Sequence, residues 1–193
     1  MAAPQKTDRR ARPETREAIL ERAVDLASAE GLEGLSIGRL AAETGMSKSG
    51  LFRHFGSKQE LQLAAIEAGA RRFIAEVVEP ALSAEEGAPR LRALCEHYVN
   101  HLERQVFSGG CFWGAVSAEF DDRPGLVRDS VRGAVTAWVG ELARQAEIAG
   151  VEDPERLAFE ILSLGQGANS RYRLTGDERA FGWVRDAYER ILP

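Results

Sequence analysis

The chain has 193 residues, of which 44% are hydrophobic and 28% charged, a balance typical of a globular protein with a sizeable core. No apolar run approaches the roughly 18 residues that a membrane span needs. The polar, basic N-terminus has no apolar stretch behind it, so we expect no secretory signal, no membrane partner and a cytoplasmic location. The two cysteines, Cys95 and Cys111, are expected to be reduced, packed thiols.

The net charge of −5 is unevenly distributed along the chain. Residues 1–58 carry ten Lys and Arg against eight Asp and Glu, whereas residues 59–193 carry fifteen against twenty-two. This asymmetry favours a basic end that faces phosphates and an acidic remainder. We predict that residues 1–12 form a disordered basic tail, either a solvated leader, which we favour, or an arm that enters a DNA minor groove. The basic residues of this tail are Lys6, Arg9, Arg10 and Arg12.

The chain is predicted to be all-helical, because Ala, Leu, Glu and Arg dominate and strand-type alternation is absent. A first helix is expected over residues 13–30, with Gly31 as its C-terminal cap. The fourth helix, over residues 58–79, is expected to stop at Pro80 because a proline cannot continue a helix. Asp153 and Asp177 are the expected caps of the last two helices. The other helices are expected at about 36–44, 48–55, 89–107, 111–120, 126–149, 153–174 and 177–192.

A segment near the N-terminus has the pattern of two short helices joined by a tight turn. Ser36 and Ser47 are suitable N-caps, and Gly45 stands where the chain must leave the first helix in a left-handed conformation. Leu51 and Phe55 are four residues apart and therefore share an inward face. With a polar leading edge on the second helix, this pattern predicts a helix-turn-helix, whose second helix enters the DNA major groove.

The exposed side of the second short helix has the chemistry of a major-groove reader. Lys48 and Arg53 can meet phosphates or guanine edges, and the ring of Phe52 can lie against a sugar or a thymine methyl group. Gly50 is expected to let the helix backbone approach the duplex, and Lys58 can meet phosphate at the start of the next helix. The predicted DNA-binding residues are Ser36, Arg39, Lys48, Ser49, Gly50, Phe52, Arg53, His54 and Lys58.

These residues resemble the tetracycline-repressor (TetR) family of transcriptional regulators. The segments that carry the resemblance are 15–23, 34–37 and 51–61. The resemblance implies a three-helix helix-turn-helix DNA-binding domain over residues 13–58 and a larger helical ligand-binding and dimerisation domain over residues 59–193. It carries the family's DNA contacts to Ser36, Lys48, Ser49, Phe52, His54 and Lys58. Phe52 stands where the family usually has Tyr, and Gly38 stands where some members have a base-reading side chain.

Aromatic residues concentrate near the middle of the chain, where they could form either ordinary core or the wall of a ligand cavity. The resemblance favours a cavity for some of them, since pockets between bundle helices are apolar with a few polar groups. The aromatic candidates are Phe107, Phe112, Trp113, Phe120 and Trp138, and the polar ones are His97, Tyr98, His101, Gln166 and Asn169. We expect a small, mostly apolar effector to bind there.

The leading hypothesis is a homodimeric repressor that binds a palindromic operator and is released by its effector. The last two helices are expected to form the dimer, and the apolar or small residues proposed for it are Phe159, Leu162, Gly165, Phe181, Val184 and Tyr188. An alternative is a DNA-binding regulator without a small-molecule ligand, whose larger domain only dimerises.

Three other patterns point to different chemistry, and each has a simpler explanation. Residues 34–38 match the G-x-S-x-G pattern of hydrolases, but no strand precedes Ser36, which fits better as a helix cap. His97 and His101 have a metal-compatible spacing, but Tyr98 replaces the glutamate of the H-E-x-x-H motif. The glycines of residues 165–167 lack the third glycine of a dinucleotide loop. We therefore expect no enzyme activity, cofactor or metal ligand.

Overall fold

The computed structural model describes residues 16–193, and every regular element in this part of the chain is helical. The elements are α1 (Arg16–Gly34), α2 (Ile37–Thr44), α3 (Lys48–Phe55), α4 (Lys58–Phe73), a π-helical turn (Ile74–Val78), α5 (Glu79–Ala81), α6 (Ala88–Glu103), α7 (Phe112–Phe120), α8 (Leu126–Ile148), α9 (Pro154–Thr175) and α10 (Arg179–Ile191). The all-helical prediction is confirmed. The predicted basic tail and residues 13–15 of the predicted first helix lie outside the described residues.

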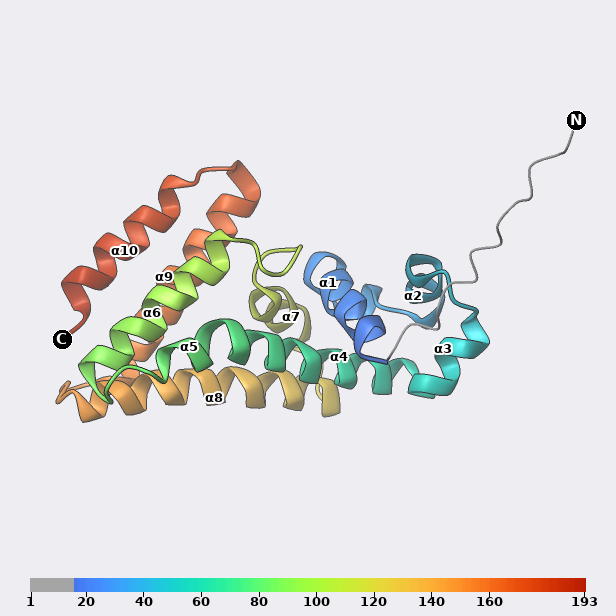
Figure 1. The fold of residues 1–193 in the computed structure, drawn as a ribbon, viewed down its shortest axis with the longest axis horizontal. Coiled ribbons are helices and arrows are strands. Elements are labelled where there is room, and N and C mark those ends of the chain that lie inside the picture. Colours follow the sequence, from blue (N-terminus) through green and yellow to red (C-terminus); the bar gives the residue numbers. More distant parts are fainter. Residues whose placement is uncertain (1–15) are drawn as a thin grey trace, which may run out of the picture.

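The long helix α4 connects the two ends of the molecule (Figure 1). Its first turns pack against α1 beside the short helices α2 and α3, and its later turns lie along α8. The other long helices, α6, α9 and α10, form the opposite end, and α7 lies between α1 and α8. A small N-terminal helix-turn-helix unit is therefore followed by a larger helical one, as the sequence predicted.

The first helical run of α1 breaks at Gly31, where the sequence predicted its end. Gly31 has a positive φ of 78°, which glycine adopts readily, but the chain then re-enters helix and continues to Gly34. The new turn begins with free backbone N–H groups, and the carboxylate of Glu119 accepts those of Leu32 and Glu33. A contact from α7 therefore explains the extension, and no local sequence signal predicts it.

Other predicted helix boundaries differ by up to four residues, since the helix expected over residues 89–107 ends at Glu103. The helix that includes α4 passes Pro80 and reaches Ala81. Proline has no backbone N–H to donate, and the π-helical turn just before Pro80 changes the spacing of the backbone hydrogen bonds at this point. Helix α10 begins at Arg179, with Glu178 rather than Asp177 in the cap position. Asp177 still accepts the backbone N–H of Arg179 at 3.3 Å.

Most residues expected to present a dimer surface lie inside the protomer instead. Phe181, Val184 and Tyr188 are at most 4% exposed. Gly165 is buried against Tyr98, whose ring occupies the space that a Cβ atom would take. These positions face inward because α10 packs on α9 and α6 within one chain.

His101 is buried in an aromatic cluster on α6. Its ring meets Phe73 and Phe107 edge-on, at centroid distances of 5.4 and 5.1 Å. Neither ring nitrogen has a hydrogen-bond partner among the described residues. Burial, with the positive charges of Arg72 and Arg104, lowers the pKa of His101 to about 4. The imidazole is therefore neutral in the folded protein at neutral pH.

This burial predicts an acid-dependent loss of stability. Below pH 6.5, His101 is protonated in the unfolded chain but stays neutral in the folded protein until the pH approaches 4. The free energy of unfolding therefore falls as the pH drops through this range. Between pH 7 and pH 5 this group should cost about 2 kcal/mol. The variant His101→Phe keeps an aromatic ring in the cluster. Between pH 7 and pH 5 it should lose about 2 kcal/mol less stability than the parent. Urea unfolding at both pH values measures it.

His97→Asn on the same helix serves as the control and should lose as much stability as the parent. An equal loss in His101→Phe and the parent would contradict the assignment of the acid sensitivity to His101.

Candidate functional site

The helix-turn-helix forms through local capping. The Oγ atom of Ser36 accepts the Arg39 N–H at 3.1 Å, and that of Ser47 accepts the Gly50 N–H, also at 3.1 Å. Between the two helices Gly45 has a left-handed φ of 67°. Leu51 is fully buried, which anchors α3 against the rest of the unit. The predicted caps and turn are confirmed.

The outward face of α3 presents a compact set of polar and aromatic side chains. Lys48, Ser49, Arg53 and His54 are exposed, and the Phe52 ring is 56% exposed. A shallow depression lies on this face, lined by Ile37, Lys48, Ser49, Phe52 and Arg53. An exposed aromatic ring flanked by two cations, on a helix whose opposite side is buried, is suited to insertion into a polyanionic groove.

Two predicted DNA-binding residues have structural tasks. Gly50 is buried, and a Cβ atom there would stand 3.1 Å from the Ser47 Oγ atom. The expectation that Gly50 brings the backbone to the duplex is therefore wrong, because this position faces the cap and the interior. Ser36 is half-buried, and its Oγ atom is engaged in the cap of α2.

Arg39 and Lys58 already have acidic partners. Arg39 pairs with Glu30 at 2.9 Å and with Glu43 at 2.8 Å. The Lys58 Nζ atom donates to the Glu33 carbonyl at 2.8 Å and pairs with its carboxylate at 2.9 Å, and this hydrogen bond lowers the pKa of Glu33. These pairs are exposed, and exposed pairs contribute little energy, so a phosphate can compete for either cation.

A second candidate site is a cavity of about 790 Å³ in the larger half of the molecule. Its walls come from α4, the π-helical turn, α6, α7, α8 and α9. The lining residues are Ala70, Phe73, Ile74, Val78, Leu82, Tyr98, Cys111, Trp113, Gly114, Ser117, Ala118, Ala134, Val135, Ala137, Trp138, Glu141, Arg144, Leu162 and Gln166. The size and the mostly apolar wall are typical of a small-molecule site.

The predicted ligand-binding residues divide into two groups. Those that line the cavity are Tyr98, Trp113, Trp138 and Gln166. Those that the structure places outside the lining are His97, His101, Phe107, Phe112, Phe120 and Asn169. The second group is mostly core: Phe107 and Phe112 are fully buried, and the Asn169 Oδ1 atom accepts the Cys111 N–H at 3.2 Å.

One wall of the cavity is polar but neutral. The Gln166 amide donates to the Tyr98 hydroxyl and to the Cys111 sulfur, each at 3.1 Å. Burial raises the pKa of both Tyr98 and Cys111, so that each keeps its proton at neutral pH. This wall therefore presents hydrogen-bonding groups without a charge.

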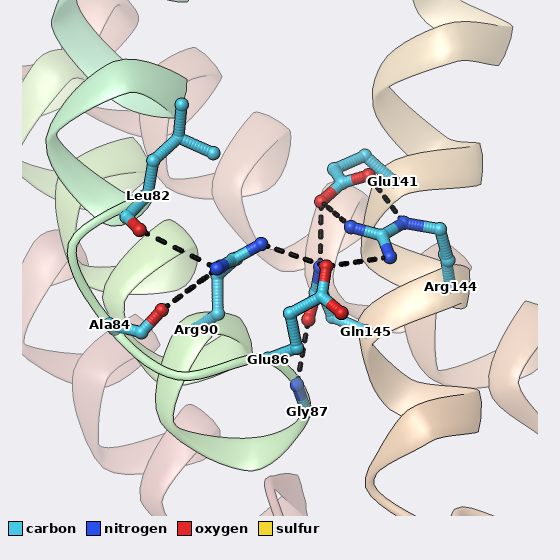
Figure 2. A network of polar contacts seen from close by, with 8 residues as sticks. All are labelled: Leu82, Ala84, Glu86, Gly87, Arg90, Glu141, Arg144 and Gln145. Atoms are coloured by element: carbon cyan, nitrogen blue, oxygen red, sulfur yellow. Dashed lines mark hydrogen bonds and ion pairs between the residues drawn. The ribbon is translucent and has the colours of Figure 1, made fainter.

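Two charged lining residues, Glu141 and Arg144, belong to a network of polar contacts that the sequence did not predict (Figure 2). Arg144 pairs with Glu141 on its own helix and with Glu86 from the loop before α6, each at 3.0 Å. Glu86 also pairs with Arg90 at 3.0 Å, while Gln145 accepts the Gly87 N–H at 2.8 Å. Two guanidinium groups and two carboxylates thus balance and tie the loop to α8. In sequence, Glu141 and Arg144 have the spacing of an ordinary surface pair, so no signal marked them.

Within residues 16–193, no helix is long and apolar enough to cross a bilayer. In the same part of the chain, no three His, Cys, Asp or Glu side chains gather where they could hold a metal ion.

Comparison with known proteins agrees with both halves of this architecture. Residues 19–65 match the family described as "Bacterial regulatory proteins, tetR family", and residues 87–188 match "Tetracyclin repressor-like, C-terminal domain". The chain is 29% identical over 190 residues to the HTH-type transcriptional repressor Rv3405c of Mycobacterium tuberculosis, covering 96% of this chain and 95% of that protein.

Solved structures share the fold over nearly the whole chain. A TetR transcriptional regulator from Legionella pneumophila superposes with a TM-score of 0.82 at 21% identity, covering 95% of this chain and all of that one. AibR, solved with isovaleryl coenzyme A and operator DNA, gives a TM-score of 0.70 at 26% identity, covering 86% of this chain and 94% of AibR. With both family matches and the helix-turn-helix geometry in agreement, this chain belongs to the TetR family of DNA-binding transcriptional regulators.

Proposed function

We propose that this protein is a homodimeric repressor that binds a palindromic operator and is released by a small, mostly apolar effector. The observation that carries the proposal is the exposed face of α3, where Lys48, Phe52 and Arg53 stand outward on a helix anchored by buried Leu51. The repressor name of the Mycobacterium tuberculosis relative and the operator complex of AibR support it. Ser36, the residue of the alternative hydrolase hypothesis, is accounted for by its cap.

In the proposed complex α3 lies in the major groove. Lys48 and Arg53 would neutralise phosphates or read guanine, while the Phe52 ring, with Ile37 beside it, would cover a thymine methyl group. One recognition helix reads only a few base pairs, so a second copy, with its helix about 34–36 Å away, is needed for a specific site.

The exposed side of α9 is suited to contact with a second copy of the chain. Phe159 and Leu174 are 65% and 86% exposed, at the two ends of the helix. Between them the small residues Ser163, Gly167 and Ser170 are exposed, as are Arg171 and Arg173 near the C-terminal end of the helix. Phe159 comes eight residues before Gly167 and Leu174 seven residues after it. Antiparallel helices that cross at Gly167 would therefore bury Phe159 of one protomer near Leu174 of the other, which is the self-complementary contact of a two-fold dimer.

The cavity supports an uncharged effector. Its charged end is internally balanced, because both carboxylates that reach Arg144 already satisfy it. An anionic ligand would have to displace one of them, whereas an apolar ligand gains from the surrounding wall. The alternative regulator without a ligand would leave the cavity without a role.

The DNA-binding proposal predicts a general electrostatic loss in Lys48→Ala. Because Lys48 would contact phosphate, the variant should bind all DNA sequences more weakly and lower the salt slope by about one unit per contact in each protomer. Fluorescence anisotropy on a site selected from random DNA, at several salt concentrations, measures both. Arg104→Ala removes an exposed cation directly after α6 and should behave as the parent. Unchanged affinity and slope in Lys48→Ala would rule out the proposed docking.

The dimer proposal predicts that Gly167→Gln yields monomers without unfolding the protomer. A Cβ atom at Gly167 meets nothing within 4 Å, and a helical glycine replaced by glutamine gains about 0.5–1 kcal/mol of helix propensity. Gly133→Gln on α8 has the same open surroundings and should remain dimeric. Sedimentation velocity at micromolar concentration distinguishes the two. A dimeric Gly167→Gln variant, or a monomeric parent on and off DNA, would refute this interface.

The effector proposal predicts that the neutral dye Nile red binds in the cavity. Binding should change the emission of Trp113 and Trp138, which line it. Ala134→Phe fills the cavity and should weaken binding at least about tenfold, since it removes the space for the ring system. Thr136→Phe, exposed on the same helix, is the matched control and should bind as the parent. Equal affinities of the two variants would place the binding site elsewhere.

A further inference from the structure

We propose that Glu119 is the positioning residue that transmits occupancy of the cavity to the DNA-binding helices. This inference rests on the proposed ligand-responsive function. Glu119 is near the end of α7, and its two carboxylate oxygens accept backbone N–H groups from α1: that of Leu32 at 2.6 Å and that of Glu33 at 2.9 Å. These partners are 87 and 86 residues away in sequence, so the contact joins the two functional halves of the molecule.

The local backbone of α1 is shaped to receive this carboxylate. Gly31 turns the chain with a φ of 78°, and the next two peptide groups point their N–H groups at Glu119. A Cβ atom at Gly31 would stand 2.6 Å from the Glu119 Oε1 atom, so a side chain here would push the carboxylate away. An anion at the start of a helical turn is a favourable, charge-assisted contact.

The same two residues also bind α4, through their other backbone atoms. The buried Gln62 side chain donates to the Leu32 carbonyl at 2.8 Å, and the Lys58 Nζ atom donates to the Glu33 carbonyl at 2.8 Å. Lys58 begins α4, directly after α3. A shift of the Leu32–Glu33 turn therefore moves the end of α4 that supports the recognition helix.

The other side of α7 forms part of the cavity wall. Trp113, Gly114 and Ser117 line the cavity and precede Glu119 on the same short helix. Gly114 packs so closely on the Gln166 side chain that a Cβ atom would collide with it. A ligand that fills the cavity thus meets α7 directly, and α7 responds as a unit because it has only nine residues.

A second tie between the same regions provides a matched control. Just before α7, the Gly109 N–H donates to the Ser28 Oγ atom at 2.9 Å. This contact joins the loop to the middle of α1, where the Ser28 Oγ atom donates to the Asp25 carbonyl. Asp25 meets α4 only at Arg72, in the last turn of that helix, far from Lys58 and Gln62. Loss of the Ser28 hydroxyl should therefore weaken packing without interrupting the route from Glu119 to Gln62 and Lys58.

The test measures operator affinity with and without saturating Nile red in three full-length proteins. In the parent, Nile red should weaken operator binding about five- to 150-fold, which is the ratio of the operator affinities without and with the dye. Glu119→Gln keeps the side-chain shape but turns one N–H acceptor into a donor. Operator DNA and Nile red should each still bind to this variant, while the ratio falls to about one. Ser28→Ala should keep the parent ratio. A merely structural role for Glu119 would change stability and leave the ratio intact.

A second readout in the parent needs no variant. Hydrogen exchange at the Leu32 and Glu33 amides should accelerate about tenfold when Nile red binds, since both lose a bond to a charged acceptor. The proposal is overturned if the Glu119→Gln ratio lies within about two-fold of the parent ratio. It is equally overturned if the exchange rates of the Leu32 and Glu33 amides do not change when Nile red binds. It is also overturned if the parent ratio is one or if Nile red fails to bind. Operator affinity measured without dye tests the DNA-binding function separately.

Discussion

The fold depends on one constraint, which is that α4 packs against α1 with its first turns and against the cavity side of the molecule with its last turns. Its first turns pack on α1 and hold the Leu32–Glu33 turn through Gln62, while its last residue, Phe73, lies against Tyr98 and Trp138 in the wall of the cavity. A helix fixed at both ends cannot adjust one end freely, because protein interiors are close-packed and resist small displacements. The recognition helix and the cavity therefore both pack against the same helix, α4.

The distribution of polar groups follows from this arrangement. Around the cavity, most polar side chains are neutral and hydrogen-bonded, as with Tyr98 and Gln166, or paired with an opposite charge, as with Glu141 and Arg144. The exceptions are the buried Nε1 atom of Trp138 in the cavity wall and the two ring nitrogens of His101 in the neighbouring core, which have no partner among the described residues. On α3, by contrast, Lys48 and Arg53 point outward, where a polyanion can meet them. These two cations are therefore available to the expected DNA.

The parts of the molecule that depend on local signals could be predicted from the sequence. Ser36, Gly45 and Ser47 act within a few residues of themselves, so the helix-turn-helix followed directly from their order. Positions set by distant contacts could not be predicted. In the sequence, nothing distinguishes Glu119 from an ordinary surface glutamate, because its partner on α1 is 87 residues away. Phe107 and Trp113 are both aromatic, but only Trp113 lines the cavity.

The composition of the cavity wall has an evolutionary consequence. Ala70, Ala118, Ala134 and Ala137 line it, so much of its volume is bounded by single methyl groups on regular helices. One nucleotide change can enlarge any of these side chains and reshape the space, while the backbone contacts of α4 and Glu119 stay as they are. A lineage can therefore alter the shape of the cavity one residue at a time, without rebuilding the parts that hold DNA.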